Sequence, residues 1–143
     1  MANIVPDSFK TDLLGGVFDF DSSGGSTFKL ALYTSIGGFS TSTTAYTTTN
    51  EVSSSGTSYT AGGNTLTNNG VAVSSNIAYV DFADLTFSSV TLTAVGALIY
   101  KSSSNEAVLV LDFGGSKTAT NGDFVIQFPT ANSSNAIIRL GDA

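Results

Sequence analysis

Two aspartates in the segment 18–25 have the spacing of a calcium-binding loop. Asp19 and Asp21 are separated by one residue and are followed by two serines and two glycines. Carboxylate oxygens on such a turn could hold a hard cation, but a third acidic position and a later bidentate glutamate are both missing. We interpret the segment as an acidic turn between strands and expect no metal site.

Five other acids could form the carboxylate pair of a hydrolase. The candidate pairs are Asp81 with Asp84, and Asp112 with Asp123 or Glu106. A glycosidase needs two carboxylates on opposite sides of a cleft, and nothing in the spacing places these across from one another. For Asp81 and Asp84 we favour a simpler interpretation, in which they end a strand and start a turn.

Nucleophilic chemistry has little support. Ser26 and Lys29 match the pattern S-x-x-K, whose mechanism requires the two residues one helical turn apart. Here they start a predicted strand, where positions i and i+3 point to opposite faces. The five Gly-Gly pairs indicate turns, because none precedes a Lys-Ser/Thr that opens a helix. The chain contains no His and no Cys, which excludes Cys or His metal sites, cysteine nucleophiles and His-based triads. Because the other catalytic patterns are also unsupported, we expect no enzyme, no catalytic residue and no cofactor.

The tyrosines could instead form a platform for glycan binding. Tryptophan, the best platform for a sugar ring, is absent. Each tyrosine also fits a half-buried strand position, and we favour that interpretation. The five are Tyr33, Tyr46, Tyr59, Tyr79 and Tyr100.

Charge and length limit the possible partners. The 143 residues carry 11 acids and 5 scattered bases, a net charge of −6. Without a basic cluster we expect neither nucleic acid nor an anionic membrane surface as a partner. No apolar run approaches the ~18 residues of a spanning helix. The segment 52–80 has no charged residue, and such a surface favours a protein attached to a larger assembly. The first four residues lack a signal-peptide pattern, so we expect synthesis in a cytoplasm.

A short helix is expected near the N-terminus. Asp7 or Ser8 can cap its first turn, and Gly15 can provide a left-handed stop. Phe9, Leu13 and Leu14 fall on one face. Because one or two turns are not stable alone in water, this helix must dock on its own domain or on a neighbour.

Alternation with period two predicts strands over the rest of the chain. We expect strands at 17–20, 28–33 and 77–82. Asn69-Gly70 predicts a hairpin between 64–68 and 71–75, and Asn121-Gly122 predicts another that leads into 124–128. The segment 40–50 is either an edge strand or a long crossing loop anchored by Tyr46.

The centre of the fold is expected at 90–100 and 107–113. From Ala94 onward both faces of these strands are apolar, so a loop, the helix or a second subunit must cover the outer face. Seven to nine short strands predict an all-β antiparallel sandwich of jelly-roll type, with a small barrel as the alternative. We expect a docking helix segment at 1–16 and one sandwich domain at 17–143.

Blocks of residues along nearly the whole chain resemble a family of small virion structural proteins of tailed bacteriophages. The similarity is looser between residues 63 and 87. The blocks are Ser8–Lys10, Leu13–Gly15, Thr27–Ser35, Thr43–Val52, Gly56-Thr57, Tyr59–Gly63, Gly96–Tyr100, Ala107-Val108, Val110–Gly114, Lys117-Thr118, Phe128-Pro129 and Ile137–Arg139.

The resemblance implies a virion component without catalytic residues. Our preferred expectation is a capsid decoration, or cement, protein that binds the major capsid protein on the outside of the head shell. A tail or fibre component is the first alternative, and a glycan-binding module is the second. We assign Phe9, Leu13 and Leu14 to the docking face. The two-sided apolar strands favour a homo-oligomer, with a trimer as the first choice.

Overall fold

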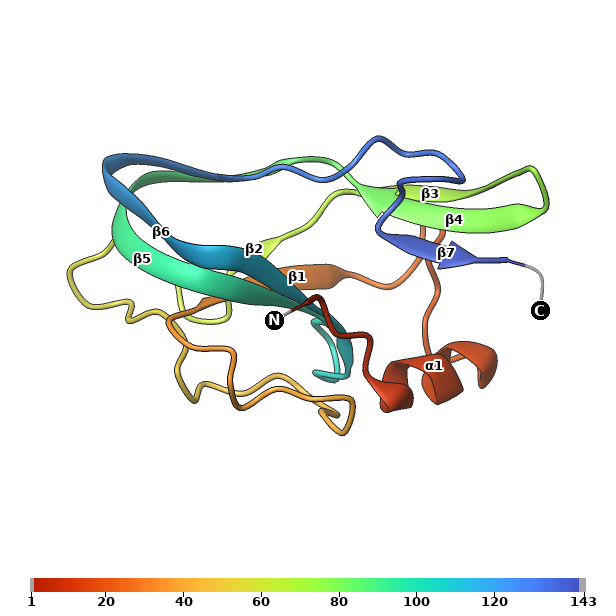
Figure 1. Ribbon diagram of the computed structural model, residues 1–143, viewed down its shortest axis with the longest axis horizontal. Coiled ribbons are helices and arrows are strands. Elements are labelled where there is room, and N and C mark those ends of the chain that lie inside the picture. The colour runs from red at the N-terminus through yellow and green to blue at the C-terminus, as the bar shows by residue number, and fades with distance from the viewer. Residues whose placement is uncertain (1, 142–143) are drawn as a thin grey trace.

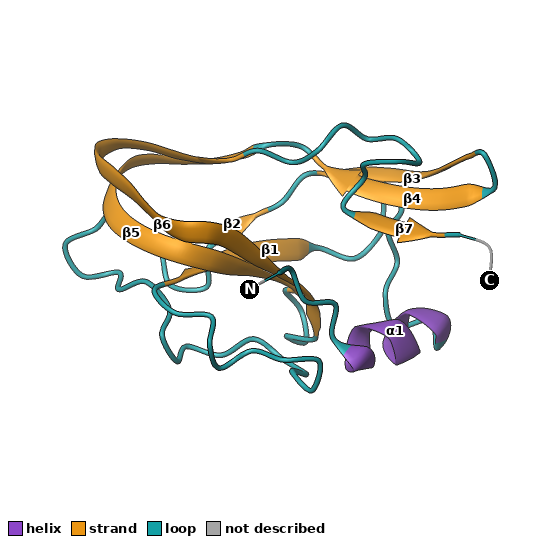
Figure 2. Ribbon diagram, in the orientation of Figure 1, coloured by secondary structure: helices purple, strands orange, loops and turns teal. Residues whose placement is uncertain are grey.

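The structure, a computed structural model, describes residues 2–141. Strands make up 46% and helix 6% of the chain, and the predicted all-β sandwich with a short N-terminal helix is confirmed (Figures 1 and 2). Residues 1 and 142–143, at the outer ends of the two predicted segments, lie outside the described residues. The elements are α1 (Asp7–Leu14), β1 (Phe28–Tyr33), β2 (Asn64–Thr65), β3 (Asn68–Ser74), β4 (Ile77–Phe82), β5 (Leu85–Lys101), β6 (Ala107–Ile126) and β7 (Ile138–Leu140).

The strands form two antiparallel sheets. One has the order β2-β1-β5-β6 and the other has the order β3-β4-β7. β1 pairs along its whole length with the end of β5, from Phe28 opposite Lys101 to Tyr33 opposite Gly96. In Figure 1 the β3-β4-β7 sheet lies to the right of the larger sheet, with α1 below it.

β5 and β6 form one long hairpin that bends back on itself. The two strands have 17 and 20 residues, longer than the predicted strands. Ala94 pairs with Lys117 and Gly96 pairs with Asp112, so residues 113–116 form a large bulge at the bend. In Figure 1 the two halves of the hairpin, on either side of the bend, lie one above the other. The bend therefore closes one end of the sandwich.

The predicted hairpin at Asn69-Gly70 is wrong. Both residues lie inside β3, at an irregularity in its pairing with β4. The turn that joins β3 to β4 is Ser75-Asn76, where both residues are left-handed, with φ of 52° and 63°. This is the backbone of a type I′ turn. The Asn-Gly signal indicated left-handed backbone, which a bulge also uses.

The predicted hairpin at Asn121-Gly122 is wrong for the same reason. These residues lie inside β6, where Gly122 pairs with Val90 and the register shifts on both sides. Asn121 has a φ of 47°. The left-handed residue is again used within a strand, so β6 continues to Ile126 instead of turning.

The ends of α1 also differ from the prediction. Pro6 occupies the N-cap position, and neither Asp7 nor Ser8 caps the helix through its side chain. Gly15 keeps a right-handed φ of −79°. The left-handed residue is Gly16, with a φ of 81°. The helix still ends at Leu14, but the left-handed residue that follows it comes one position later than the sequence suggested.

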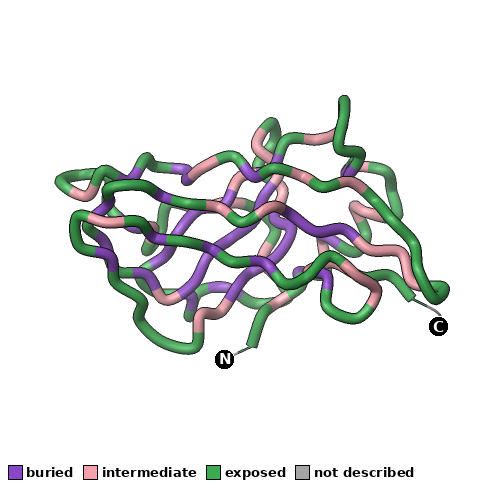
Figure 3. Tube along the Cα trace, turned by 90° about the horizontal axis from the view of Figure 1, so that it is seen from above, coloured by how far each residue is buried: buried purple, intermediate pink, exposed green. Residues whose placement is uncertain are grey.

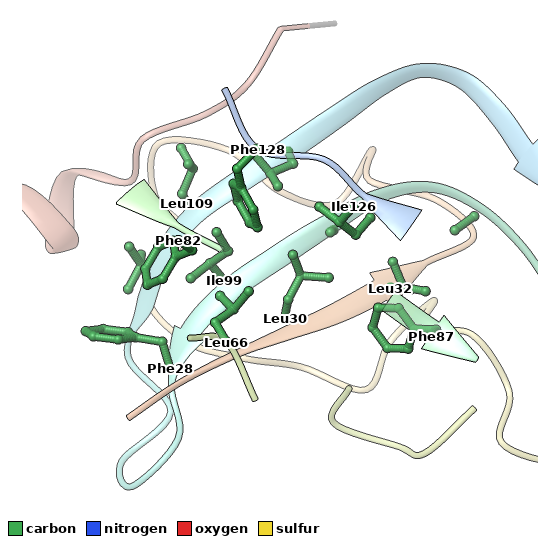
Figure 4. Close-up of a cluster of buried hydrophobic side chains, with 14 of the residues drawn as sticks. Phe28, Leu30, Leu32, Leu66, Phe82, Phe87, Ile99, Leu109, Ile126 and Phe128 are labelled. Atoms are coloured by element: carbon green, nitrogen blue, oxygen red, sulfur yellow. The ribbon is translucent and has the colours of Figure 1, made fainter. Parts of the chain in front are cut away.

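The main core is formed mostly by side chains of β1, β5 and β6, with Val80 and Phe82 of β4, and it includes aromatic rings from outside the sheets. The segment 17–20, predicted as a strand, has no strand pairing, yet Phe18 and Phe20 are buried. The rings of Phe20 and Phe28 stack with centroids 4.7 Å apart, and Phe9 lies 5.0 Å from Phe18. Leucine, isoleucine and phenylalanine side chains of β1, β4, β5 and β6 fill the rest (Figure 4).

A second apolar cluster lies on the outer face of the larger sheet, under the loop of residues 34–62. Ile36 and Phe39 of this loop are buried with Tyr33, Leu98 and Val110 of the sheet. The loop runs along that face of the sheet (Figure 1), and the buried residues concentrate in the strands (Figure 3). We expected a loop, the helix or a second subunit to cover the outer apolar face of the central strands. In the structure the loop covers it. The segment 40–50 belongs to this loop and forms no edge strand.

Candidate functional site

A groove of about 560 Å³ lies between α1 and β7, and we call it the α1–β7 groove. Val108 and Leu109 of β6 belong to its lining, together with residues of α1 and of the stretch 136–140. Two leucines at this groove are strongly exposed, Leu14 by 82% and Leu140 by 59%. Single exposed leucines are ordinary, but two beside one apolar groove form a surface that another protein can bury.

The three residues assigned to the docking face all line the α1–β7 groove, but they differ in burial. Phe9 is buried, and its ring lies 5.0 Å from Phe18 and 6.2 Å from Phe20. Leu13 is partly buried against the same core, and Leu14 points away from it. Leu14 and Leu13 are therefore open to a partner, whereas Phe9 holds the helix on the domain.

Charged side chains stand at the rim of the α1–β7 groove. Lys10 forms an exposed ion pair with Asp7, with 2.7 Å between Nζ and Oδ1. Arg139 donates a hydrogen bond to the carbonyl of Ser133 at 3.5 Å. Exposed pairs of this kind contribute at most about 1 kcal/mol to stability. They surround the apolar lining with polar groups, as the rim of a protein interface does.

The acids proposed as a hydrolase pair have local roles. Asp84 is exposed, and its Oδ1 accepts the backbone N–H of Phe128 at 2.8 Å. Asp81 is buried, and its Oδ1 accepts the N–H of Phe82 at 2.9 Å. Its Oδ2 has no hydrogen-bond partner among the described residues. Burial raises the pKa of the Asp81 carboxyl, and the charge of Asp84 adds to that rise.

This raised pKa predicts how Asp81→Asn changes the pH dependence of stability. A carboxyl whose pKa is higher in the folded chain stabilises the fold below the unfolded pKa and loses that contribution as pH rises through the folded pKa. Asparagine stays neutral throughout. We expect the melting temperature of the variant, relative to the wild type, to rise between pH 3 and pH 7. Calorimetry at both pH values measures it, with Asp84→Asn as the exposed control. An equal difference at both pH values would contradict the prediction.

The remaining acidic candidates also bond to nearby groups. Asp112 accepts the N–H of Gly114 at 2.9 Å, and Asp123 accepts the N–H of Ser89 at 3.4 Å. Glu106 accepts a hydrogen bond from the hydroxyl of Ser104. Each carboxylate thus supports a turn or a bulge.

The segment 18–25 is the acidic turn expected from its sequence. Asp19 accepts the N–H of Asp21 at 3.0 Å through its side chain, which is an Asx turn. Ser26 of the S-x-x-K pattern accepts the N–H of Asp19 at 3.1 Å. Within residues 2–141 no group of three acids is placed to hold a metal ion.

Glu51 is the centre of a polar cluster that the sequence analysis missed. Its Oε1 accepts the Tyr59 hydroxyl at 2.8 Å and the Gly62 N–H at 2.6 Å, and its Oε2 accepts the Tyr46 hydroxyl at 2.6 Å. The Tyr100 hydroxyl donates to the carbonyl of Gly62 at 2.6 Å. One signal was available, because Glu51 is the only charged residue between positions 30 and 80.

These contacts also place the tyrosines considered for glycan binding. Tyr33, Tyr59 and Tyr100 are buried. Tyr46 stacks on Tyr100, with ring centroids 4.6 Å apart. Four of the five tyrosines are therefore committed to the loop of residues 34–62 and its support, and Tyr79 is half-buried on β4.

No family of known proteins, no curated protein and no solved structure matches this chain. In residues 2–141 no helix has the length and apolar character needed to cross a membrane.

Proposed function

We propose that the protein is a structural component of a tailed-phage virion, a capsid decoration protein that binds the outside of the head shell. The exposed leucines at the α1–β7 groove carry the proposal, because they form an apolar surface that a partner can bury. The sequence resemblance to small virion proteins supplies the partner, the major capsid protein. The protein would be made in the host cytoplasm and would remain on the virion.

Burial of apolar side chains can provide the binding energy. Burying one leucine contributes about 1.5–3 kcal/mol. The groove lies between packed elements, so little conformational entropy is lost on docking. Many weak contacts on a symmetric shell add up, and each bound copy stabilises the assembled state over the dissociated one. A homo-oligomer would strengthen this effect by presenting several grooves at once.

Leu14→Asp is expected to weaken binding to isolated head shells by about tenfold or more per site, the loss that follows from removing one buried leucine. Leu14 is 82% exposed, so the fold is expected to tolerate the change. Val125→Asp is the matched control, because Val125 is 54% exposed and lies on β6 outside the groove. Co-sedimentation with shells that lack the protein measures the affinity.

Equal binding by Leu14→Asp and the wild type would contradict the docking surface. The location within the particle is a separate question. A decoration protein should be abundant and stay with heads when purified particles are separated into heads and tails. A scarce band that follows the tails would favour a tail component instead.

A further inference from the structure

β3 is an unprotected edge of the smaller sheet. It pairs with β4 on one side, and no segment of residues 2–141 pairs with its other side (Figure 1). Val71 and Val73 are 56% and 71% exposed. Beyond the bulge at Asn69-Gly70, the strand from Val71 to Ser74 contains no charged residue and no proline, two features that keep an edge from pairing with another chain.

The hairpin geometry shows which backbone groups point outward. Ser74 and Ile77 flank the two-residue turn, so they form a hydrogen-bonded pair. Hydrogen-bonded and non-hydrogen-bonded pairs alternate along an antiparallel ladder. Ala72 therefore bonds to β4, whereas Val71 and Val73 turn their N–H and C=O groups away from it. The outer edge of β3 carries two donors and two acceptors in a row.

We propose that β3 pairs antiparallel with β3 of a second copy, across a two-fold axis at Ala72. In this register Val71 of one copy lies opposite Val73 of the other, and each such pair exchanges two hydrogen bonds. An antiparallel edge is self-complementary under two-fold symmetry. The two three-stranded sheets become one continuous sheet in the order β7-β4-β3-β3-β4-β7.

The side chains around the axis favour a second copy. Val71 and Val73 lie opposite Val80 and Ala78, and Ala78 lies opposite Leu140, so these residues share one apolar face. Pairing extends this face across the axis and buries the exposed valines. Each chain carries a net charge of −6, and an uncharged edge lets two such chains meet without placing like charges side by side.

Two-fold pairing gives a dimer, whereas the two-sided apolar strands favoured a trimer. The loop of residues 34–62 covers those strands within one chain, so they no longer call for a second subunit. The inference about β3 is independent of the proposed docking at the α1–β7 groove. Leu14→Asp should leave the dimer intact, and failure of either idea would leave the other standing.

A cysteine at the axis tests the register. Ala72 would face its own copy in a non-hydrogen-bonded pair, where Cα atoms lie about 4.5 Å apart. That distance is within the range of disulfides, about 4.4–6.8 Å. The chain has no native cysteine, so Ala72→Cys should form a covalent dimer under mild oxidation, seen on a non-reducing gel. Val125→Cys, which is also exposed but lies on β6 rather than on the β3 edge, should react far more slowly. Equal rates for the two would overturn the proposal.

A charge on the edge tests the interface without a new bond. Val73→Lys places an ammonium beside its symmetry mate's edge and should raise the dimer dissociation constant by at least tenfold, while Val125→Lys should leave it unchanged. Sedimentation equilibrium measures both, and circular dichroism checks the fold. The proposal would be overturned by a wild-type chain that stays monomeric to about millimolar concentration, or by a dimer that persists in Val73→Lys. A monomeric wild type would indicate that the β3 edge pairs with a strand of another protein.

Discussion

Replacing Gly63 with alanine is expected to leave the chain unfolded. A Cβ atom at this position would lie 1.8 Å from the carbonyl oxygen of Leu30 and 2.8 Å from the Cα of Ala31. Both contacts are to the backbone of β1, which is paired on both sides, with β2 and with β5. Gly63 also has a left-handed φ of 76°. The obstacle cannot rotate away, so either the sheet or the loop must move.

The expected loss is a large part of the total stability. Substitutions that force backbone apart fall in the range above about 4 kcal/mol, and a domain of this size has about 5–15 kcal/mol in total. Gly56→Ala is the matched control. Gly56 has a similar φ of 73°, but a Cβ there would meet no atom within 4 Å. Its expected cost is the left-handed strain alone, about 1–2 kcal/mol.

Urea unfolding followed by circular dichroism separates the two variants. Gly56→Ala should unfold cooperatively at a somewhat lower midpoint, and Gly63→Ala should lack the transition. Similar midpoints for both would show that β1 yields to the new methyl group, and the close approach of the loop to β1 would then not be essential to the fold.

Period-two alternation located two of the strands that form the core, whereas β5 and β6 are longer than predicted. The segments 28–33 and 77–82 match β1 and β4 to the residue. Alternation failed at 17–20, where buried and exposed residues also alternate but no neighbouring strand supplies hydrogen bonds. The alternation of apolar and polar side chains indicates which residues are buried. Whether a segment forms a strand also depends on a neighbouring strand for its backbone hydrogen bonds, and the local sequence does not reveal that neighbour.

Turn signals failed for a related reason. Asn-Gly at 69–70 indicates left-handed backbone, and a bulge inside β3 uses it as well as a turn would. The actual turn, Ser75-Asn76, has no glycine. Local chemistry therefore identified the unusual backbone conformation, while the length of the β3–β4 ladder decided which pair of residues makes the turn.

Half of the candidate docking surface was visible in the sequence. The helical spacing of Leu13 and Leu14 predicted an apolar face, but it could not show that Phe9 turns into the core. Leu140 reaches the groove because β7 pairs with β4, with Leu140 opposite Ala78. A contact between the two ends of the chain depends on this pairing, which no local pattern encodes.

Removing the Glu51 carboxylate is expected to release the loop of residues 34–62 from the sheet. Three donors converge on this carboxylate, from Tyr46, Tyr59 and Gly62. Hydrogen bonds to a charged group contribute about 1.5–3 kcal/mol each, and a donor left without a partner adds a desolvation cost. Glu51→Ala should lower the free energy of unfolding by about 3 kcal/mol or more. Glu106→Ala is the control, because that carboxylate bonds to an adjacent serine at the surface.

Tyrosine ionisation gives a second measurement of the same cluster. Burial raises the pKa of Tyr46 and of Tyr59 above the ordinary value of 10.0, and the Glu51 carboxylate raises both further. A folded-state pKa above the unfolded value contributes stability that is present below pH 10 and is lost as pH rises through the folded pKa. The wild type should therefore lose stability above pH 10. The absorbance of its ionised tyrosines should appear at a higher pH than that of free tyrosine.

In Glu51→Ala that absorbance should appear at lower pH, and a protease should cut within residues 34–62 while the β5–β6 hairpin stays protected. A variant that melts like the wild type and titrates like it would show that the packing of Ile36 and Phe39, together with the backbone hydrogen bonds between the loop and the sheet, holds the loop without the carboxylate. If the loop is instead released, the outer face of the larger sheet is uncovered, and Leu98 and Val110 become exposed apolar surface. Aggregation of the variant would follow from that exposure. The single carboxylate of a nearly uncharged stretch would then be what keeps a two-sided apolar sheet covered within one chain.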